Sequence, residues 1–183
     1  MAYARKFNFK ISARDQVFNM VARNNPDWAF KPVDFSIGVP QTVTTGTRNT
    51  SVVLTAATGG NYEGTDTVYY NRLQLAKFFP GGTTLDALPL VVIDKLGDYA
   101  SALSQLNTDF ELLLSSDDVV LAKSVDQSGV PAYQERVTVK AKPTSLAYLG
   151  TFDILVKQRA IPLSEVITTT MMSGLDYPAG VTG

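Results

Sequence analysis

The residues best suited to chemistry in this chain are two adjacent acids, Asp117 and Asp118. With Asp109 or Glu111, which lie close in the sequence, their carboxylate oxygens could hold a hard cation such as Ca²⁺ or Mg²⁺. The ligand spacing of an EF-hand loop is absent, and no glycine stands where that loop requires one. The pattern therefore favours a surface loop over a metal site, and we predict no bound metal.

The composition removes several classes of enzyme. The 183-residue chain contains no Cys and no His, so it lacks a thiolate nucleophile and the imidazole base of Ser-His-Asp and Cys-His hydrolases. Chemistry that uses carboxylates alone, as in glycosidases, remains open, but no pattern in the sequence marks a catalytic pair. We therefore predict a protein that is not an enzyme and needs no cofactor.

The N-terminal segment combines basic and aromatic side chains, namely Tyr3, Arg5, Lys6, Phe7, Phe9 and Lys10. Such a segment could contact nucleic acid through charge and stacking. The net charge of the whole chain is only −1, which provides no general attraction to nucleic acid or to an anionic membrane. The segment also lacks the apolar core of a signal peptide, and no apolar run is long enough to span a bilayer. We expect a soluble protein without nucleic-acid or membrane partners.

Charge is distributed unevenly along the chain. All charged residues before Asp15 are basic, whereas all charged residues between Lys95 and Lys123 are acidic. Both segments are typical of solvated faces, but a basic arm and an acidic segment could also meet across a subunit boundary. The apolar residues of the arm could add a strand to a neighbouring sheet. We therefore predict assembly contacts at Arg5, Lys6, Phe7, Phe9, Lys10, Asp117 and Asp118.

The elements that must position these residues follow from hydrophobic periodicity and turn signals. The pattern predicts helices over residues 13–24, with Ser12 as N-cap, 89–96 and 99–106, and a capping box that begins at Thr108. Strands are predicted over residues 33–37, 50–58, 65–73, 136–142 and 151–157, the last two as an antiparallel hairpin. The sum is an α+β fold, with a mainly antiparallel sheet of about four to six strands and two or three packed helices. We divide the chain into an N-terminal arm (1–12), a single domain (13–172) and a C-terminal tail (173–183).

The stretch "TVYYNRLQLAKFF", residues 67–79, changes period halfway. Its first half alternates like a strand and its second half has helical spacing. The pattern favours a structural joint made by Tyr70, Asn71 and Arg72, in which Arg72 donates hydrogen bonds to nearby carbonyls or a carboxylate. A subunit interface and a ligand-stacking platform are the alternatives.

Four stretches of the sequence resemble a known family. They are "RNTSVVLTAATGGNYEGTDTVYYNRLQL", "LPLVVIDKL", "VTVKAKPTSLAYLGTFDILV" and "SGLDYP". This series is similar to virion structural proteins of large tailed bacteriophages, and the resemblance covers residues 13–178. None of the four stretches is a catalytic motif.

The resemblance implies a component of a phage particle, such as a head decoration, neck, tail or baseplate subunit. Its expected partners are copies of itself and other virion proteins, and its expected location is the virion, assembled in the host cytoplasm. The alternative is a carbohydrate-binding or receptor-binding module on the virion surface, which would use exposed aromatic residues such as Trp28, Tyr62 or Tyr133.

Overall fold

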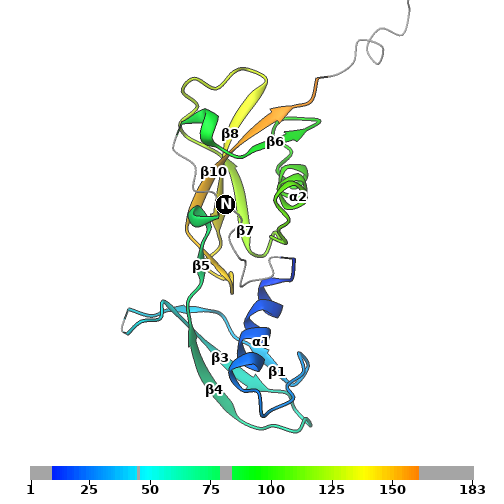
Figure 1. The fold of residues 1–183 in the computed structure, drawn as a ribbon, viewed down its shortest axis with the longest axis vertical. Helices are drawn as coiled ribbons and strands as arrows, with labels where there is room; N and C mark the ends of the chain where they lie inside the picture. Colours follow the sequence, from blue (N-terminus) through cyan, green and yellow to red (C-terminus); the bar gives the residue numbers. More distant parts are fainter. Residues whose placement is uncertain (1–9, 45, 79–83, 161–183) are drawn as a thin grey trace, which may run out of the picture.

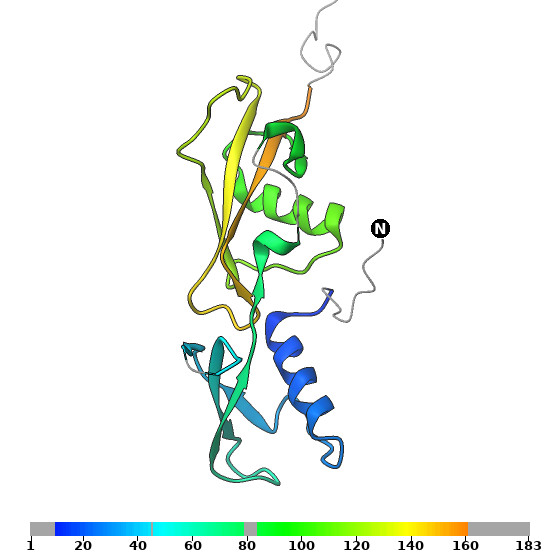
Figure 2. The ribbon, with the colours of Figure 1, turned by 60° about the vertical axis from the view of Figure 1, so that its left-hand side comes forward.

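The computed structural model of the protein describes residues 10–44, 46–78 and 84–160. These residues form an elongated body with two lobes that follow each other along its long axis (Figures 1 and 2). We call residues 13–70 the lower lobe and residues 84–160 the upper lobe, as they lie in Figure 1. Residues 71–78 pass along the narrow junction of the two lobes (Figure 2).

The lower lobe is an antiparallel sheet with one helix on one face. Its elements are α1 (Ala13–Asn24), β1 (Phe35–Ile37), β2 (Gln41–Thr42), β3 (Thr50–Ala56) and β4 (Thr65–Tyr70). β3 lies in the middle, with β1 and β2 along one side and β4 along the other. The predicted cap of α1 is confirmed, because the Ser12 hydroxyl oxygen accepts a hydrogen bond from the Asp15 backbone N–H at 3.1 Å.

The helix α1 is held to the sheet by residues spaced three or four apart, as an amphipathic helix requires. Val17 packs with Val52 and Tyr70 in one cluster, and Phe18 and Val21 pack with Phe35 in a second. The opposite face of the sheet is not covered by this helix.

The upper lobe is a four-stranded sheet with the second helix packed on one face. Its elements are η2 (a 3₁₀ turn, Leu85–Ala87), β6 (Leu90–Ile93), α2 (Tyr99–Phe110), β7 (Val119–Lys123), β8 (Gln134–Ala141) and β10 (Thr151–Gln158). The strand order is β6-β10-β8-β7, and only the β6–β10 pair is parallel. The predicted hairpin of β8 and β10 is confirmed.

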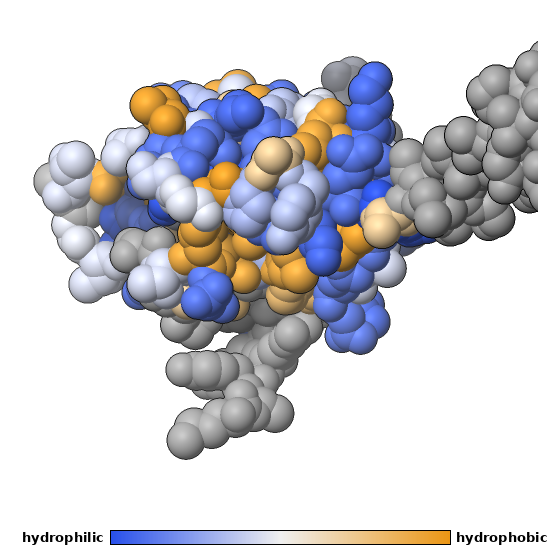
Figure 3. All heavy atoms as spheres, turned by 90° about the horizontal axis from the view of Figure 1, so that it is seen from above, coloured by the Kyte–Doolittle hydropathy of each residue, from blue (hydrophilic) through white to orange (hydrophobic). Residues whose placement is uncertain are grey.

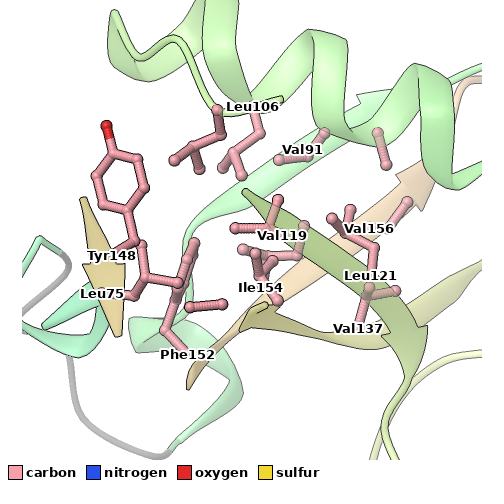
Figure 4. Packing of buried hydrophobic residues seen from close by; sticks show 14 of the residues in the cluster. Leu75, Val91, Leu106, Val119, Leu121, Val137, Tyr148, Phe152, Ile154 and Val156 are labelled. Carbon is pink, nitrogen blue, oxygen red and sulfur yellow. The ribbon is translucent and has the colours of Figure 1, made fainter. Parts of the chain in front are cut away.

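The main hydrophobic core lies between α2 and the upper sheet (Figure 4). Alternate residues of β8, such as Val137 and Val139, are fully buried, as are Ile154 of β10 and Leu106 of α2. Seen from the upper end, apolar residues lie among hydrophilic ones on the surface (Figure 3). Because buried and less buried residues alternate along much of β8 and β10, these two strands could be predicted from the sequence.

A third, two-stranded parallel sheet lies at the junction of the lobes. It pairs β5 (Leu73–Gln74) with β9 (Tyr148–Leu149) and is followed by a 3₁₀ turn, η1 (Leu75–Lys77). The predicted change of period in residues 67–79 corresponds to the passage of the chain from β4 through β5 into η1. Residue 79 lies outside the described residues.

Two helix predictions are wrong. Residues 89–96 do not form a helix, because residues 90–93 are the strand β6, which pairs in parallel with β10. A short apolar run does not reveal its period, and here the β-branched residues Val91, Val92 and Ile93 fit a strand. Thr108 does not begin a helix either, since it lies inside α2 and its hydroxyl donates to the Ser104 carbonyl at 3.0 Å. The N-cap of α2 is Asp98, which accepts from the Ser101 N–H at 3.1 Å.

The α+β class with mainly antiparallel strands is confirmed. The described residues contain two α-helices and ten strands in three sheets, two of them four-stranded. The N-terminal arm up to residue 9 and the predicted tail lie outside the described residues, and the described part of the predicted single domain forms the two lobes. None of its helices is both long and apolar enough to cross a membrane.

Candidate functional site

The side chain of Arg72 lies buried at the junction of the lobes, with 5% of its surface exposed. Its Nε donates to the Thr50 Oγ1 of the lower sheet at 2.9 Å. Its Nη1 donates to the carbonyl oxygens of Pro143 and Ser145, both at 3.0 Å, in the loop before β9. Burial lowers the pKa of Arg72 below its ordinary value, and neighbouring Tyr70 opposes this effect. One guanidinium therefore ties the two lobes together.

The backbone of Arg72 is held by an asparagine that the sequence analysis did not single out as a site residue. Asn49 Oδ1 accepts from the Arg72 N–H at 2.9 Å, and Asn49 Nδ2 donates to the Arg72 carbonyl at 3.2 Å. The Asn49 N–H in turn donates to Asn71 Oδ1 at 2.9 Å. The amide side chains of Asn49 and Asn71 thus fix the corner at which β4 ends.

Two buried tyrosines complete the junction. The Tyr70 hydroxyl donates to the Leu146 carbonyl at 2.6 Å, and burial raises the pKa of Tyr70 to about 12. The Tyr148 hydroxyl accepts from Gln16 Nε2 of α1 at 2.8 Å, and burial raises the pKa of Tyr148 as well. Both tyrosines therefore link an element of the lower lobe to the segment around β9.

The predicted acid pair is split by the structure. Asp118 is buried, and its carboxylate accepts from the Ser115 hydroxyl at 2.7 Å and from the Ser145 hydroxyl at 3.1 Å. Asp117 is exposed. The Asp118 side chain is occupied inside the fold of one chain, which argues against the predicted assembly contact there. The contact at Asp117 stays a prediction. Among the described residues, no group of three or more Asp or Glu side chains could hold a metal ion.

The predicted arm contacts Arg5, Lys6, Phe7 and Phe9 lie outside the described residues. Lys10 is described, and its Nζ lies 3.3 Å from Glu111 Oε1 at the end of α2, with both side chains exposed. A shallow hollow of about 360 Å³ lies beside this pair. Basic arm and acidic segment therefore meet within one chain at this point.

Of the three aromatics proposed for glycan binding, Trp28 and Tyr133 are exposed and Tyr62 is partly buried, and the three do not form one group. The Trp28 and Tyr62 rings, which follow α1 and lie between β3 and β4 respectively, are edge to face with centroids 6.3 Å apart. Tyr62 also packs against Phe30, at 5.2 Å, and Phe30 against the core residue Phe35. Tyr133 belongs to the upper lobe, where Lys157 Nζ lies 5.8 Å from its ring centroid.

The uncovered face of the lower sheet was not identified from the sequence. We call it the outer face, and its side chains come from alternate positions of three strands: Ser36, Ser51, Val53, Thr55, Thr65, Thr67 and Tyr69. None of these residues is charged, and Tyr69 and Val53 are 59% and 45% exposed. The register places Tyr69 opposite Ser51 and Thr67 opposite Val53. The Thr-rich alternation of residues 50–58 and 65–73 was the sequence signal that could have revealed it.

No curated protein and no solved structure matches this chain. A family of unknown function, DUF7941, matches over residues 8–183 and so includes both lobes. The match covers nearly the whole chain, and the chain therefore belongs to this family.

Proposed function

We propose that the protein is a non-enzymatic structural subunit of a tailed-phage virion, which acts through repeated contacts with copies of itself and with other virion proteins. The resemblance of four sequence stretches to virion proteins supports a role as a component of a phage particle. The outer face of the lower sheet supports the mode of action, because it is exposed and carries no charge.

The composition of the outer face suits contact with protein. Sheets that face water on one side usually present polar and charged residues there, whereas the centres of interfaces are poor in charge and rich in Tyr. Here Thr and Ser surround two exposed apolar side chains, Tyr69 and Val53. A face without charge can also meet an identical face without repulsion between like charges.

The experiment uses particles made by the genome that encodes the chain. They are purified on density gradients, and the chain is quantified by mass spectrometry and located with labelled antibody. We expect many copies per particle at one repeated position. Abundant chain in the lysate but none in purified particles would overturn the proposal.

A matched pair of variants tests the outer face. Tyr69→Glu places a charge on that face, and we expect it to lower incorporation into particles while the melting temperature stays near that of the wild type. Val125→Glu, at a fully exposed position of the upper lobe, is the control and should be incorporated normally. Equal incorporation of both variants would contradict a role of the outer face in assembly.

The Trp28–Tyr62 pair favours a second candidate function, a carbohydrate-binding or receptor-binding module on the particle. Trp28 is 60% exposed, and its position is fixed by the aromatic series that leads through Phe30 to the core. Aromatic faces of this kind can contact the apolar side of a ligand while their polar edges remain wet. Binding to a glycan array that is lost in Trp28→Ala, with unchanged incorporation into particles, would favour this function.

A further inference from the structure

We propose that the free edge of β4 receives the N-terminal residues 3–9 of a second copy as an additional strand. This inference rests on the proposed function and names one of its repeated contacts. It joins three observations, which are an unpaired strand edge, an alternating N-terminal segment and opposite local charges.

The edge of β4 is open to a further strand. Among the described residues, β4 pairs only with β3. Gly64 O accepts from the Ala56 N–H at 3.0 Å, so the antiparallel alternation directs the backbone groups of Thr65, Thr67 and Tyr69 away from β3. All three residues are exposed. Such an edge is a ready template for pairing with another chain.

One backbone group of this edge is already occupied. The Thr67 N–H donates to the carboxylate of its own neighbour, Asp66, at 2.7 Å. An incoming strand must therefore offer a carbonyl to Thr67 and a positive charge to Asp66. The Asp66 carboxylate also disfavours pairing of this edge with an uncharged or acidic strand.

The N-terminal segment has the matching pattern. Phe7 and Phe9 alternate with Lys6 and Asn8, so the two aromatic side chains point to one face of an extended strand and Lys6 to the other. If Lys6 shares the face of Asp66, the aromatic residues share the outer face with Thr67 and Tyr69. Aromatic and β-branched neighbours on one face stabilise a strand pair, as do opposite charges.

Charge supports the same pairing. Residues 1–9 contain Arg5 and Lys6 and no acid, whereas residues 50–70 contain Glu63 and Asp66 and no Lys or Arg. Opposite charge speeds encounter and selects the partner. Glu63 and Asp66 belong to the β3–β4 hairpin itself.

The proposed function, which consists of repeated contacts between copies, favours a second copy over the same chain. The chain enters α1 beside the end of α2, where Lys10 contacts Glu111, and Val17 of α1 packs against Tyr70 at the end of β4. Nine extended residues span at most about 30 Å, which is enough to line β4 in a neighbour. Since each copy offers one segment and one edge, the contact either closes as a reciprocal two-fold dimer or repeats head-to-tail as a ring or a filament.

Cysteine cross-linking tests the pairing cleanly, because the full chain has no cysteine. Arg5→Cys and Thr67→Cys are made in separate full-length chains, mixed, and treated with a short bis-maleimide. The control mixture replaces Thr67→Cys with Ser104→Cys, an exposed position on α2. We expect cross-linked dimers at least tenfold faster in the first mixture than in the control.

Three results would overturn the proposal. The first is equal rates in both mixtures. The second is equally fast dimers from Thr67→Cys alone, which would mean that two β4 edges pair. The third is cross-linking exclusively within one chain when Arg5→Cys and Thr67→Cys are combined in a single chain. Normal incorporation into particles together with any of these results would reject the N-terminal contact and leave the proposed function intact. Absence of the chain from particles would reject the proposed function itself.

Discussion

The Arg72 guanidinium donates a hydrogen bond to the Ser145 carbonyl oxygen at 3.0 Å, across the junction of the two lobes. The same guanidinium binds Thr50 of the lower sheet, and the Ser145 hydroxyl donates to the Asp118 carboxylate of the upper lobe. A continuous series of buried hydrogen bonds therefore runs from one lobe to the other. Its members are satisfied only when both lobes are in place, which couples their packing.

Replacement of Arg72 should destabilise the fold strongly. Arg72→Ala leaves the Thr50 hydroxyl and two carbonyls without their donor, and each buried group that loses its partner costs about 1–3 kcal/mol. We expect a loss of at least about 3 kcal/mol in the free energy of unfolding, measured by urea denaturation. Arg72→Lys should lose less, because it keeps a donor.

Arg159→Ala is the matched control for this measurement. Arg159 is exposed, and its Nε lies 3.3 Å from the exposed carboxylate of Asp94. An exposed ion pair contributes about 0–1 kcal/mol. Equal unfolding midpoints for Arg72→Ala and Arg159→Ala would contradict a structural role for Arg72 at the junction.

The two acids should differ sharply in their effect on stability. Asp118→Asn replaces one acceptor oxygen by an amide group beside Ser115 and Ser145, and should cost about 1–3 kcal/mol. Asp117→Asn, at the adjacent exposed position, should stay within about 0.5 kcal/mol of the wild type. Urea titrations with and without added Ca²⁺ compare both variants. A stabilisation by Ca²⁺ that Asp117→Asn abolishes would revive the metal site.

The sequence predicted a structural joint at Tyr70, Asn71 and Arg72, but it did not reveal which residues bind Arg72. The period change in residues 67–79 and the five donors of Arg72 predicted a joint. The accepting carbonyls lie 71 and 73 residues further along the chain, and no local pattern encodes that separation. Asn49 was missed as a site residue for the same reason, since its bonds to Arg72 depend on the pairing of β3 with β4.

The fold shows the same division between local and distant determinants. α1, β8 and β10 were predictable because their capping or alternation is local. β6 was misread because its buried run becomes a strand only beside β10, more than 60 residues later. Two acids side by side looked equivalent, but the burial of Asp118 depends on distant contacts such as the hydrogen bond from the Ser145 hydroxyl. Tertiary context thus decided what local propensity left ambiguous.

The core of the upper lobe should be sensitive to loss of volume. Leu106 of α2 is fully buried against the sheet (Figure 4). Leu106→Ala should cost about 2–5 kcal/mol, because it removes buried methyl groups and leaves a cavity. Leu113→Ala, at a position that is 45% exposed, is the control and should cost about 1 kcal/mol or less. Equal losses in thermal or urea unfolding would contradict the assignment of the core.

The burial of Tyr70 predicts a loss of stability at high pH. The folded protein raises the pKa of Tyr70 from 10.0 to about 12, so the neutral phenol is favoured in the folded state. Its contribution is complete below pH 10 and declines as the pH rises from 10 to 12, because the unfolded chain then releases a proton that the folded chain retains. The expected decline is about 2–3 kcal/mol.

Two tyrosine variants isolate this effect in urea titrations at several pH values. Tyr70→Phe loses the bond to the Leu146 carbonyl, so it should be less stable by about 1 kcal/mol at neutral pH. The deficit should shrink or reverse toward pH 12, because only the wild type carries the titrating group. Tyr69→Phe, the exposed neighbour, should keep the steep decline of the wild type. Parallel curves for the wild type and Tyr70→Phe would show that the Tyr70 hydroxyl does not titrate from a buried site.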